Sequence, residues 1–229
     1  MNGCIEGRDI MSKGAISGSV IRRLPRYYRF LGELESNGYT RISSRELAEK
    51  MGLTASQIRQ DLNCFGEFGQ QGYGYNVSAL KGEIAHILGI DKHTPMILLG
   101  AGNLGKALAR QIDFEGKGFS LIGAFDVSPA VIGENIGGVE VMSVDTLEAF
   151  CGEHKPVAAI LCVPRSAAAQ LADRLVDCGV RAFWNFSHYD LRIEHKNVAV
   201  ENVHLVDSLI TLSYAVNSDV NKKERCPDK

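Results

Sequence analysis

The chain has 229 residues, of which 45% are hydrophobic, so it is long enough to form two modest domains that each bury a core. Its net charge of −2 does not by itself indicate nucleic-acid binding, and no apolar run approaches the roughly 20 residues that a membrane helix needs. The six cysteines lack CxxC or metal-ligand spacing, which favours free thiols in a reducing cytoplasm over a disulfide scaffold or a metal site.

The first part of the chain predicts a helical domain over residues 16–90, behind a disordered extension of residues 1–15. Apolar residues at helical spacing predict a helix over 20–36, whose regular part begins at Pro25 because proline is tolerated in a first turn. Between Lys13 and Arg29 the chain carries five cations and no acid. This basic segment either binds phosphate or is a solvated helix face.

Two shorter helices over 45–51 and 54–65, joined by a short turn that contains glycine, predict a helix-turn-helix. A capping box at residues 43–46 opens the first of them. Glycines interleaved with aromatic residues over 66–75 fit a tight β-hairpin, and a further helix over 77–88 closes the domain. We therefore expect an N-terminal winged helix-turn-helix domain, with the hairpin as its wing.

The polar face of the predicted helix over 54–65 carries side chains that can bind DNA. Arginine pairs with guanine edges, and glutamine with adenine edges, so Arg59, Gln57 and Gln60 are candidates for base contacts. The full candidate set is Arg22, Arg23, Arg26, Thr54, Ser56, Gln57, Arg59, Gln60 and Asn63, with Gln70, Gln71 and Tyr73 on the wing. The alternative is that this face is an ordinary polar helix surface, but the adjoining wing makes that interpretation less favoured.

After a polar segment at residues 91–95, strands and helices alternate through residue 204. We expect strands over 96–99, 120–125, 139–142, 157–163, 182–185 and 198–200, and helices over 104–111, 145–150 and 166–178. This alternation predicts an α/β fold, a Rossmann-like parallel sheet with helices on both faces. A strongly apolar helix over 205–216 and a charged, disordered tail over 217–229 follow.

A GxGxxG motif lies between the first strand and first helix of this second domain, and its residues are Gly100, Ala101, Gly102, Asn103, Leu104 and Gly105. Such a motif places a pyrophosphate at a helix N-terminus. Asp126 ends the next strand, roughly 20 residues on, where an acid accepts the ribose hydroxyls and repels a 2′-phosphate. The motif therefore favours NAD(H) over NADP(H), and the alternative is that Asp126 only caps the next turn.

Further cofactor contacts are expected at strand ends, because ligands bind at the carboxyl edge of such sheets. These candidates are Val127, Val163, Pro164, Asn185 and Phe186. A dehydrogenase also needs a substrate domain and a proton donor beside the nicotinamide, and neither is evident, so we do not expect an enzyme. An NAD-dependent oxidoreductase and a CoA-binding Rossmann module remain the alternatives, and Asp126 disfavours the second.

Taken together, these motifs resemble the bacterial redox-sensing repressor family Rex. The stretches that carry the resemblance are 20–29, 57–62, 68–75, 100–105, 125–127, 163–164 and 184–186, and they span residues 16–216 in the order and spacing of the family. The resemblance implies a homodimer that exchanges its last helix and binds an inverted-repeat DNA operator. It also implies that NADH releases the DNA and that NAD⁺ competes weakly.

The resemblance implies a switch between the two functions, for which the candidates are Arg29, Gln111, His204 and Asp207. Many members have a tyrosine where this chain has Gln111, and its acidic partner corresponds to His204 or Asp207. The chain also has Gln60 where lysine is common. After Phe186 it has a serine and His188, where a small residue and proline are usual.

Overall fold

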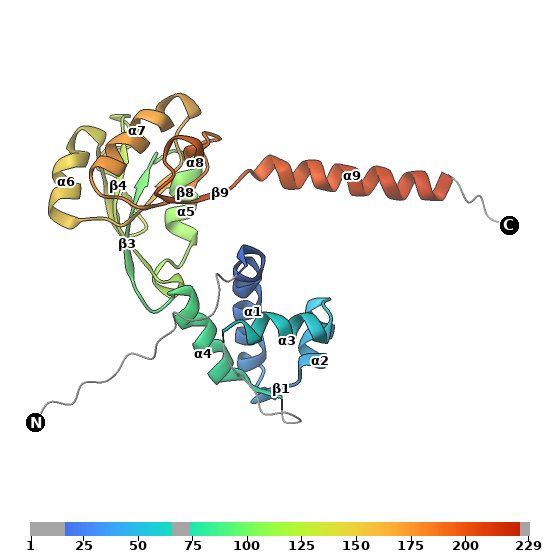
Figure 1. Cartoon of the computed structure of the whole chain (residues 1–229). Helices are drawn as coiled ribbons and strands as arrows, with labels where there is room; N and C mark the ends of the chain where they lie inside the picture. The colour runs from blue at the N-terminus through green and yellow to red at the C-terminus, as the bar shows by residue number, and fades with distance from the viewer. Residues whose placement is uncertain (1–16, 66–73, 225–229) are drawn as a thin grey trace, which may run out of the picture. The chain divides into compact units, whose positions relative to one another are not determined.

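The computed structural model describes residues 17–65 and 74–224, and it divides into two compact units, Met1–Asp91 and Lys92–Lys229 (Figure 1). The predictions for residues 1–15 and for the wing residues Gln70, Gln71 and Tyr73 lie outside the described residues.

The first unit is built from short helices around one apolar core. Its elements are α1 (Gly18–Ser36), β1 (Arg41–Ile42), α2 (Ser44–Met51), α3 (Ala55–Asn63), β2 (Tyr75–Asn76) and α4 (Val77–Leu88). The capping box predicted at residues 43–46 is present, with Ser43 as the N-cap of α2. The left-handed Gly52 (φ 63°) ends α2 before α3 begins, as the predicted helix-turn-helix requires.

The prediction that the regular first helix begins at Pro25 is wrong. Helix α1 begins at Gly18, where the Ser17 side chain accepts a hydrogen bond from the Ser19 N–H, and Pro25 lies inside the helix. Pro25 is exposed, whereas Leu24 and Tyr27 beside it are fully buried. The missing hydrogen bond therefore falls on the solvent side, and burial on the other side holds the helix together.

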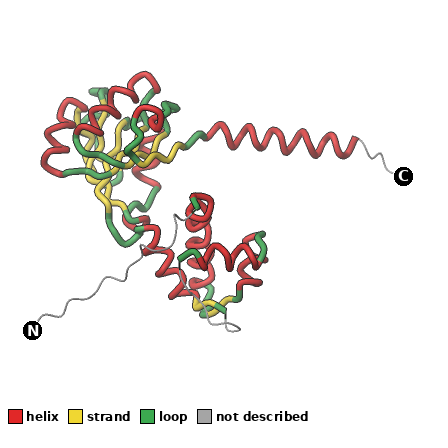
Figure 2. Tube along the Cα trace, in the orientation of Figure 1, coloured by secondary structure: helices red, strands yellow, loops and turns green. Residues whose placement is uncertain are grey.

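The second unit contains a seven-stranded sheet in the order β5-β6-β4-β3-β7-β8-β9. The strands are β3 (Thr94–Leu99), β4 (Phe119–Asp126), β5 (Asn135–Ile136), β6 (Val139–Ser143), β7 (Ala158–Leu161), β8 (Ala182–Asn185) and β9 (Ala199–Asn202). All neighbouring pairs are parallel except β5 with β6, an edge hairpin that the sequence patterns did not predict. The predicted parallel sheet is otherwise confirmed, and its strands are drawn in yellow in Figure 2.

Helices cover both faces of this sheet, as predicted. The connecting helices are α5 (Asn103–Gln111), α6 (Leu147–His154), α7 (Arg165–Asp177) and α8 (Leu191–Glu194), with single 3₁₀ turns η1 (Glu115–Lys117) and η2 (Val144–Thr146). Within β3, Ile97 and Leu99 join the core formed with α6 and α7, whereas Met96 and Leu98 join the core on the α5 side. Successive side chains of this buried strand point to opposite faces of the sheet, so each face has its own core.

The chain continues into a long helix, α9 (Leu205–Glu224). Residues 217–224 are helical, so the prediction that a disordered tail begins at residue 217 is wrong. This stretch contains no glycine or proline, and an established helix extends readily through such residues. No helix among the described residues is long and apolar enough to cross a membrane.

Candidate functional site

Helix α3 presents one buried and one exposed face, as a recognition helix requires. Thr54 is its N-cap, and the Thr54 hydroxyl accepts a hydrogen bond from the Gln57 N–H at 3.1 Å. Ile58, Asp61 and Leu62 are buried against the rest of the unit. The exposed face carries four of the predicted DNA contacts, namely Ser56, Arg59, Gln60 and Asn63.

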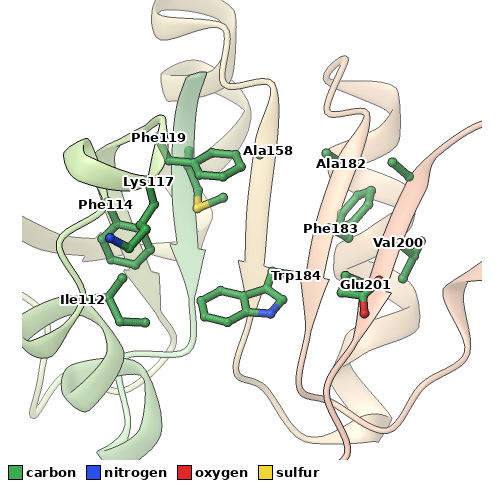
Figure 3. Close-up of a pocket in the computed structure, with 12 residues that line it drawn as sticks. Ile112, Phe114, Lys117, Phe119, Ala158, Ala182, Phe183, Trp184, Val200 and Glu201 are labelled. Carbon is green, nitrogen blue, oxygen red and sulfur yellow. The ribbon is translucent and has the colours of Figure 1, made fainter. Parts of the chain in front are cut away.

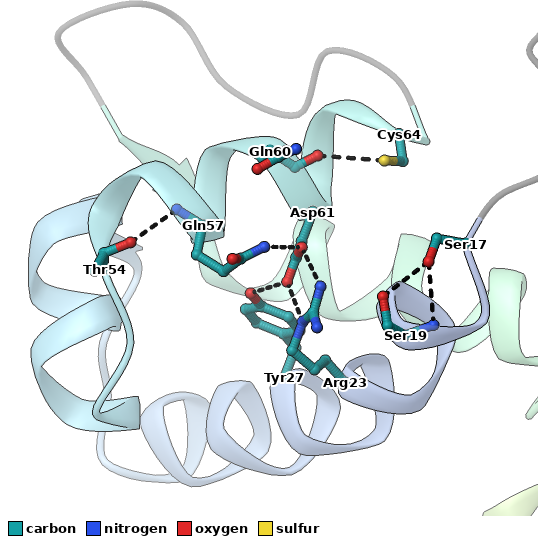
Figure 4. Close-up of polar contacts among 9 residues, drawn as sticks. All are labelled: Ser17, Ser19, Arg23, Tyr27, Thr54, Gln57, Gln60, Asp61 and Cys64. Carbon is teal, nitrogen blue, oxygen red and sulfur yellow. Dashed lines mark hydrogen bonds and ion pairs between the residues drawn. The ribbon is translucent and has the colours of Figure 1, made fainter.

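The buried side of α3 is attached to α1 through the carboxylate of Asp61, which is 0% exposed (Figure 4). Arg23 donates two hydrogen bonds of 2.7 Å, one to each carboxylate oxygen. Tyr27 Oη and Gln57 Nε2 each donate a further bond at 2.8 Å. Four bonds to one buried carboxylate satisfy its acceptor capacity, and this is the arrangement in which a buried charge is tolerated.

The pKa shifts of Asp61 and Tyr27 follow from the same contacts. Burial raises the pKa of Asp61, but hydrogen bonds from Arg23, Gln57 and Tyr27 outweigh it, so the net pKa is lowered. Burial, together with the hydrogen bond to Asp61, raises the pKa of the Tyr27 phenol. At neutral pH, Asp61 is therefore an anion and Tyr27 a neutral donor.

This network changes the interpretation of several predicted DNA contacts. Arg23 and Gln57 direct their side chains at Asp61, and Arg26 donates a hydrogen bond of 2.5 Å to the Met51 carbonyl oxygen. These side chains position α3 and α2 against α1. Sequence reasoning missed Asp61 as their partner, because an acid beside the base-reading residues has no distinctive spacing pattern.

Arg59 and Gln60 are exposed, whereas Gln57, the third predicted base-reading side chain, is half-buried. The Arg59 guanidinium donates to the hydroxyls of Ser44 at 3.1 Å and Ser56 at 3.4 Å. Hydroxyl groups are weak partners for a cation, so water or a base edge can replace them. Arg22 is likewise exposed, on α1.

The glycine motif of the second unit forms a tight turn between β3 and α5. Gly100 has φ 95°, and a Cβ there would lie 2.5 Å from the Cys162 carbonyl oxygen. A Cβ on Gly105 would lie 2.0 Å from the Gly100 carbonyl oxygen, so both positions require glycine. A Cβ on Gly102 would meet nothing within 4 Å. Gly102 is the N-cap of α5 and supplies no side-chain cap, which leaves the first N–H groups of the helix open to a ligand.

A cavity of about 220 Å³ lies beside this turn at the carboxyl edge of the sheet. Six of its lining residues were predicted to contact the cofactor: Gly100, Gly102, Asp126, Val127, Val163 and Pro164. Ala101 is buried beneath the turn, whereas Asn103 and Leu104 are exposed in the first turn of α5. The structure thus brings together residues from the ends of β3, β4 and β7.

Asp126 is engaged with the backbone on both carboxylate oxygens. It accepts a hydrogen bond from the Ala101 N–H at 2.7 Å and another from the Ser128 N–H at 2.8 Å. Each carboxylate oxygen has about two acceptor sites, so capacity remains for a hydroxyl donor. Capping the turn and accepting a ribose hydroxyl are therefore compatible roles for this residue.

Asn185 ends β8 and is fully buried. Its amide donates to the Tyr189 carbonyl oxygen and to Asn202 Oδ1, and its oxygen accepts from the N–H and hydroxyl of Ser187. Asn185 therefore shapes the loop that follows β8. Phe186 is half-buried, and its ring packs edge-on against Trp184 at 4.8 Å.

The four predicted switch residues fall on separate elements. Arg29 is exposed on α1, and Gln111 is exposed as the last residue of α5. Asp207 is exposed in the first turn of α9, and His204 precedes that helix and lies against His188. A joint switch formed by these four residues stays a prediction.

One cysteine, Cys162, lines the cavity beside the glycine turn, and its thiol is not activated. Burial raises the pKa of the Cys162 thiol, which lines the cavity, to about 12, so the thiol stays protonated at neutral pH. Among residues 17–65 and 74–224, no group of three or more histidine, cysteine or acidic side chains could hold a metal ion.

Comparison with known families supports both units. A family model described as "Putative DNA-binding protein N-terminus" matches residues 15–63, and a "CoA binding domain" model matches residues 91–189. The chain is 55% identical over 207 residues to a protein of Thermoanaerobacter sp. (strain X514) named "Redox-sensing transcriptional repressor Rex", covering 90% of this chain and 92% of that protein. A protein of the same name from Clostridium beijerinckii is 53% identical, covering 88% and 95%.

Solved structures with a similar fold support the same relationship. A crystal structure of a protein called RSP in complex with β-NAD⁺ and operator DNA matches with a TM-score of 0.85 and 54% identity, covering 93% of this chain and 97% of that chain. A structure of RSP in complex with β-NADH matches with a TM-score of 0.83 and 51% identity, covering 93% and 99%. The chain belongs to the Rex family of redox-sensing transcriptional repressors.

Proposed function

We propose that this protein represses transcription by binding an operator and leaves that operator when NADH binds, so that it reports the NADH/NAD⁺ ratio. The observation that carries the proposal is a single chain with two built sites. One is the exposed polar face of α3, and the other is the open glycine turn before α5. Relatives that are identical to this chain at more than half of the aligned positions are named as redox-sensing repressors.

The second unit fits a nicotinamide dinucleotide. The open N–H groups at the start of α5, with Gly102 offering no side chain, suit a pyrophosphate. Asp126 would accept the ribose hydroxyls and repel a 2′-phosphate. The bound cofactor supplies a ring that is cationic when oxidised and neutral when reduced. Val163 and Pro164 give the cavity an apolar wall, which disfavours a cation and hence favours NADH.

The first unit fits the major groove of DNA through α3. Arg59 would contact a guanine edge, with Gln60 and Asn63 beside it, and Ser56 near the helix N-terminus would contact phosphate. Arg23 and Gln57 would act by holding α3 through Asp61. The wing residues Gln70, Gln71 and Tyr73 would complete the interface.

We infer a homodimer that exchanges α9. Along this helix, large apolar side chains are exposed in the single chain: Leu205, Val206, Leu209, Ile210, Leu212, Tyr214 and Val216. Such a stripe indicates an interface. The α5 side of the sheet offers an apolar cavity of about 440 Å³, with Trp184, Phe114 and Phe119 around it (Figure 3). A two-fold dimer would bind an inverted repeat.

Two other functions are less well supported. The close relatives are named as repressors and not as enzymes, and the thiol in the cavity is not activated. The "CoA binding domain" model describes the fold of the second unit, whereas Asp126 favours a free ribose diol. A repressor of this kind would act in the cytoplasm, where the bacterial chromosome lies.

Operator binding measured across a series of NADH/NAD⁺ ratios tests the proposal. NADH should raise the dissociation constant for the operator, and NAD⁺ should raise it much less. NADPH and CoA serve as matched controls for the cofactor site and should leave operator binding unchanged. Tight NADH binding with constant operator affinity would overturn the sensing role.

A further inference from the structure

Two histidines that the proposed function does not assign to the cofactor or to DNA lie against each other in the second unit. His188 Nδ1 and His204 Nδ1 are 3.0 Å apart, and the two rings are nearly parallel, with centroids 5.1 Å apart and an interplanar angle of 17°. At that separation one nitrogen must carry a hydrogen and the other must accept it. Two protonated imidazoles would bring two N–H groups face to face, which is repulsive.

The pair connects two functional segments of the fold. His188 follows the loop at the end of β8, where the buried Ser187 is bonded to Asn185 at 2.6 Å. His188 itself has φ 56°, an uncommon conformation for a residue other than glycine, asparagine or aspartate. The His204 carbonyl oxygen accepts the Asp207 N–H at 3.1 Å, so His204 forms the start of α9.

Two acidic side chains close to the pair in the sequence have partners of their own. The Asp190 carboxylate accepts the Arg192 N–H at 3.2 Å, and Glu201 lies 3.8 Å from the Arg192 guanidinium. Asp207 is exposed in the first turn of α9, and Tyr189 adjoins His188. In the described part of the chain, neither imidazole has an ion pair with a carboxylate.

We propose that His188 and His204 share one proton in an Nδ1–H···Nδ1 hydrogen bond that couples the loop after β8 to the start of α9. The inference rests on the proposed function and deepens it, because the loop lies at the cofactor edge of the sheet and α9 is the inferred dimer helix.

The coupling should transmit cofactor binding to DNA binding. A ligand shifts the equilibrium between two conformations of a protein only through contacts that differ between them. A loop that is linked to α9 by one hydrogen bond can therefore pass a cofactor-dependent change in conformation to that helix. Without this bond, NADH would still bind the glycine turn, but less of its effect would reach the operator-binding units.

The bond itself is tested in the ligand-free full-length protein by nuclear magnetic resonance. A scalar coupling between the isotope-labelled Nδ1 atoms of His188 and His204 is expected at neutral pH. Absence of this coupling at neutral pH would overturn the inference, whatever the protein does with NADH.

The functional role is tested by two variants and a control. His188→Gly tolerates the left-handed backbone, and His204→Phe keeps an aromatic ring, but each removes one partner of the hydrogen bond. Coupling between two sites is typically about 5–150-fold, and we expect most of the NADH-induced change in operator affinity to be lost in both variants. NADH affinity should stay within about threefold of the parent, because His188 and His204 lie outside the lining of the cavity beside the glycine turn.

His154→Asn is the matched control, since His154 ends α6 in the same unit and should leave the NADH response unchanged. The double variant should lose no more of the response than either single variant, because both remove one bond. A full NADH response in either single variant would overturn the coupling role. A parent protein whose operator affinity ignores NADH would overturn the proposed function and this role together, while the bond would stand on its spectroscopic signature.

Discussion

Asp61 is a charged side chain that is 0% exposed, and its surroundings explain why the first unit tolerates it. The bidentate contact with Arg23 replaces the hydration that the carboxylate loses, and Tyr27 and Gln57 occupy its other acceptor sites. Because Asp61 belongs to α3 and its partner to α1, the ion pair sets the orientation of the helix that is proposed to read DNA.

We expect Asp61→Asn to destabilise the first unit. Removing one partner of a buried ion pair costs about 3–5 kcal/mol, and the cost here should fall near the lower end because the Arg23 side chain is 30% exposed. Hydrogen exchange of amides in α1 and α3 measures the change. Glu49→Gln neutralises an exposed acid on α2 in the same unit and should have little effect.

The same substitution predicts a change in acid stability. The pKa of Asp61 is lowered in the folded protein, so its contribution is fully present above the ordinary carboxyl pKa of about 4. That contribution is lost as the pH falls through the lowered folded pKa. The difference in unfolding free energy between the parent and Asp61→Asn should therefore shrink below about pH 4. A constant difference down to acid unfolding would contradict the assigned direction.

Arg59 is expected to read a base. Arg59→Ala should weaken operator binding by about 1–3 kcal/mol, because a bidentate contact to guanine is lost. NADH binding should not change, since Arg59 belongs to the other unit. Arg110→Ala, which removes one exposed cation from α5, is the control for a general loss of charge. Equal effects of the two substitutions on operator affinity would exclude base reading by Arg59.

Asp126 is expected to select the cofactor. Asp126→Ala should reduce the preference for NADH over NADPH, because the carboxylate that would repel a 2′-phosphate is gone. Affinity for NADH should also fall, since Ala101 and Ser128 lose their acceptor and the turn loosens. Calorimetric titration with both cofactors measures the ratio, and Asp177→Ala, at the exposed end of α7, is the control. An unchanged ratio would assign Asp126 to turn capping alone.

At the scale of elements, the turn between β3 and α5 shows that three glycines of one motif have different physical roles. Gly100 and Gly105 are required because a side chain would collide with backbone oxygens. Gly102 faces open space, so its lack of a side chain serves a ligand and not the fold.

This distinction predicts opposite outcomes for two alanine substitutions. Gly102→Ala should fold with nearly unchanged thermal stability but bind NADH weakly, because a methyl group would meet the pyrophosphate. Gly105→Ala should destabilise the second unit, since its Cβ would lie 2.0 Å from the Gly100 carbonyl oxygen. Thermal unfolding and NADH titration of both variants measure the contrast. Normal NADH affinity in a folded Gly102→Ala protein would show that the cofactor does not bind at this turn.

At the scale of the whole molecule, α9 is a helix whose apolar side chains are exposed in the single chain. A chain that ends before Leu205 should therefore be monomeric in analytical sedimentation, and it should bind an inverted-repeat operator much more weakly because two linked half-sites are lost. A chain that lacks only residues 225–229 is the control and should remain dimeric. If the truncated protein were still dimeric, α9 would not be part of the dimer interface.

Local patterns determined much of this protein. The glycine motif, the alternating strands and helices of the second unit, and the capped helices of the first could be predicted because each depends on residues close in the chain. Residue type and periodicity also placed the exposed face of α3 and the acid at the end of β4. The homologous motifs together identified the family before any contact was known.

Only the tertiary structure decided which polar side chains form hydrogen bonds with each other. Arg23 and Gln57 are predicted DNA contacts by residue type, yet they bond to Asp61, because α1 and α3 pack together. Asn185 is likewise engaged within its own loop. His188 and His204 lie sixteen positions apart and meet because β8 and β9 are neighbours in the sheet. Hydrogen bonds between distant segments depend on packing geometry, which local sequence patterns do not encode.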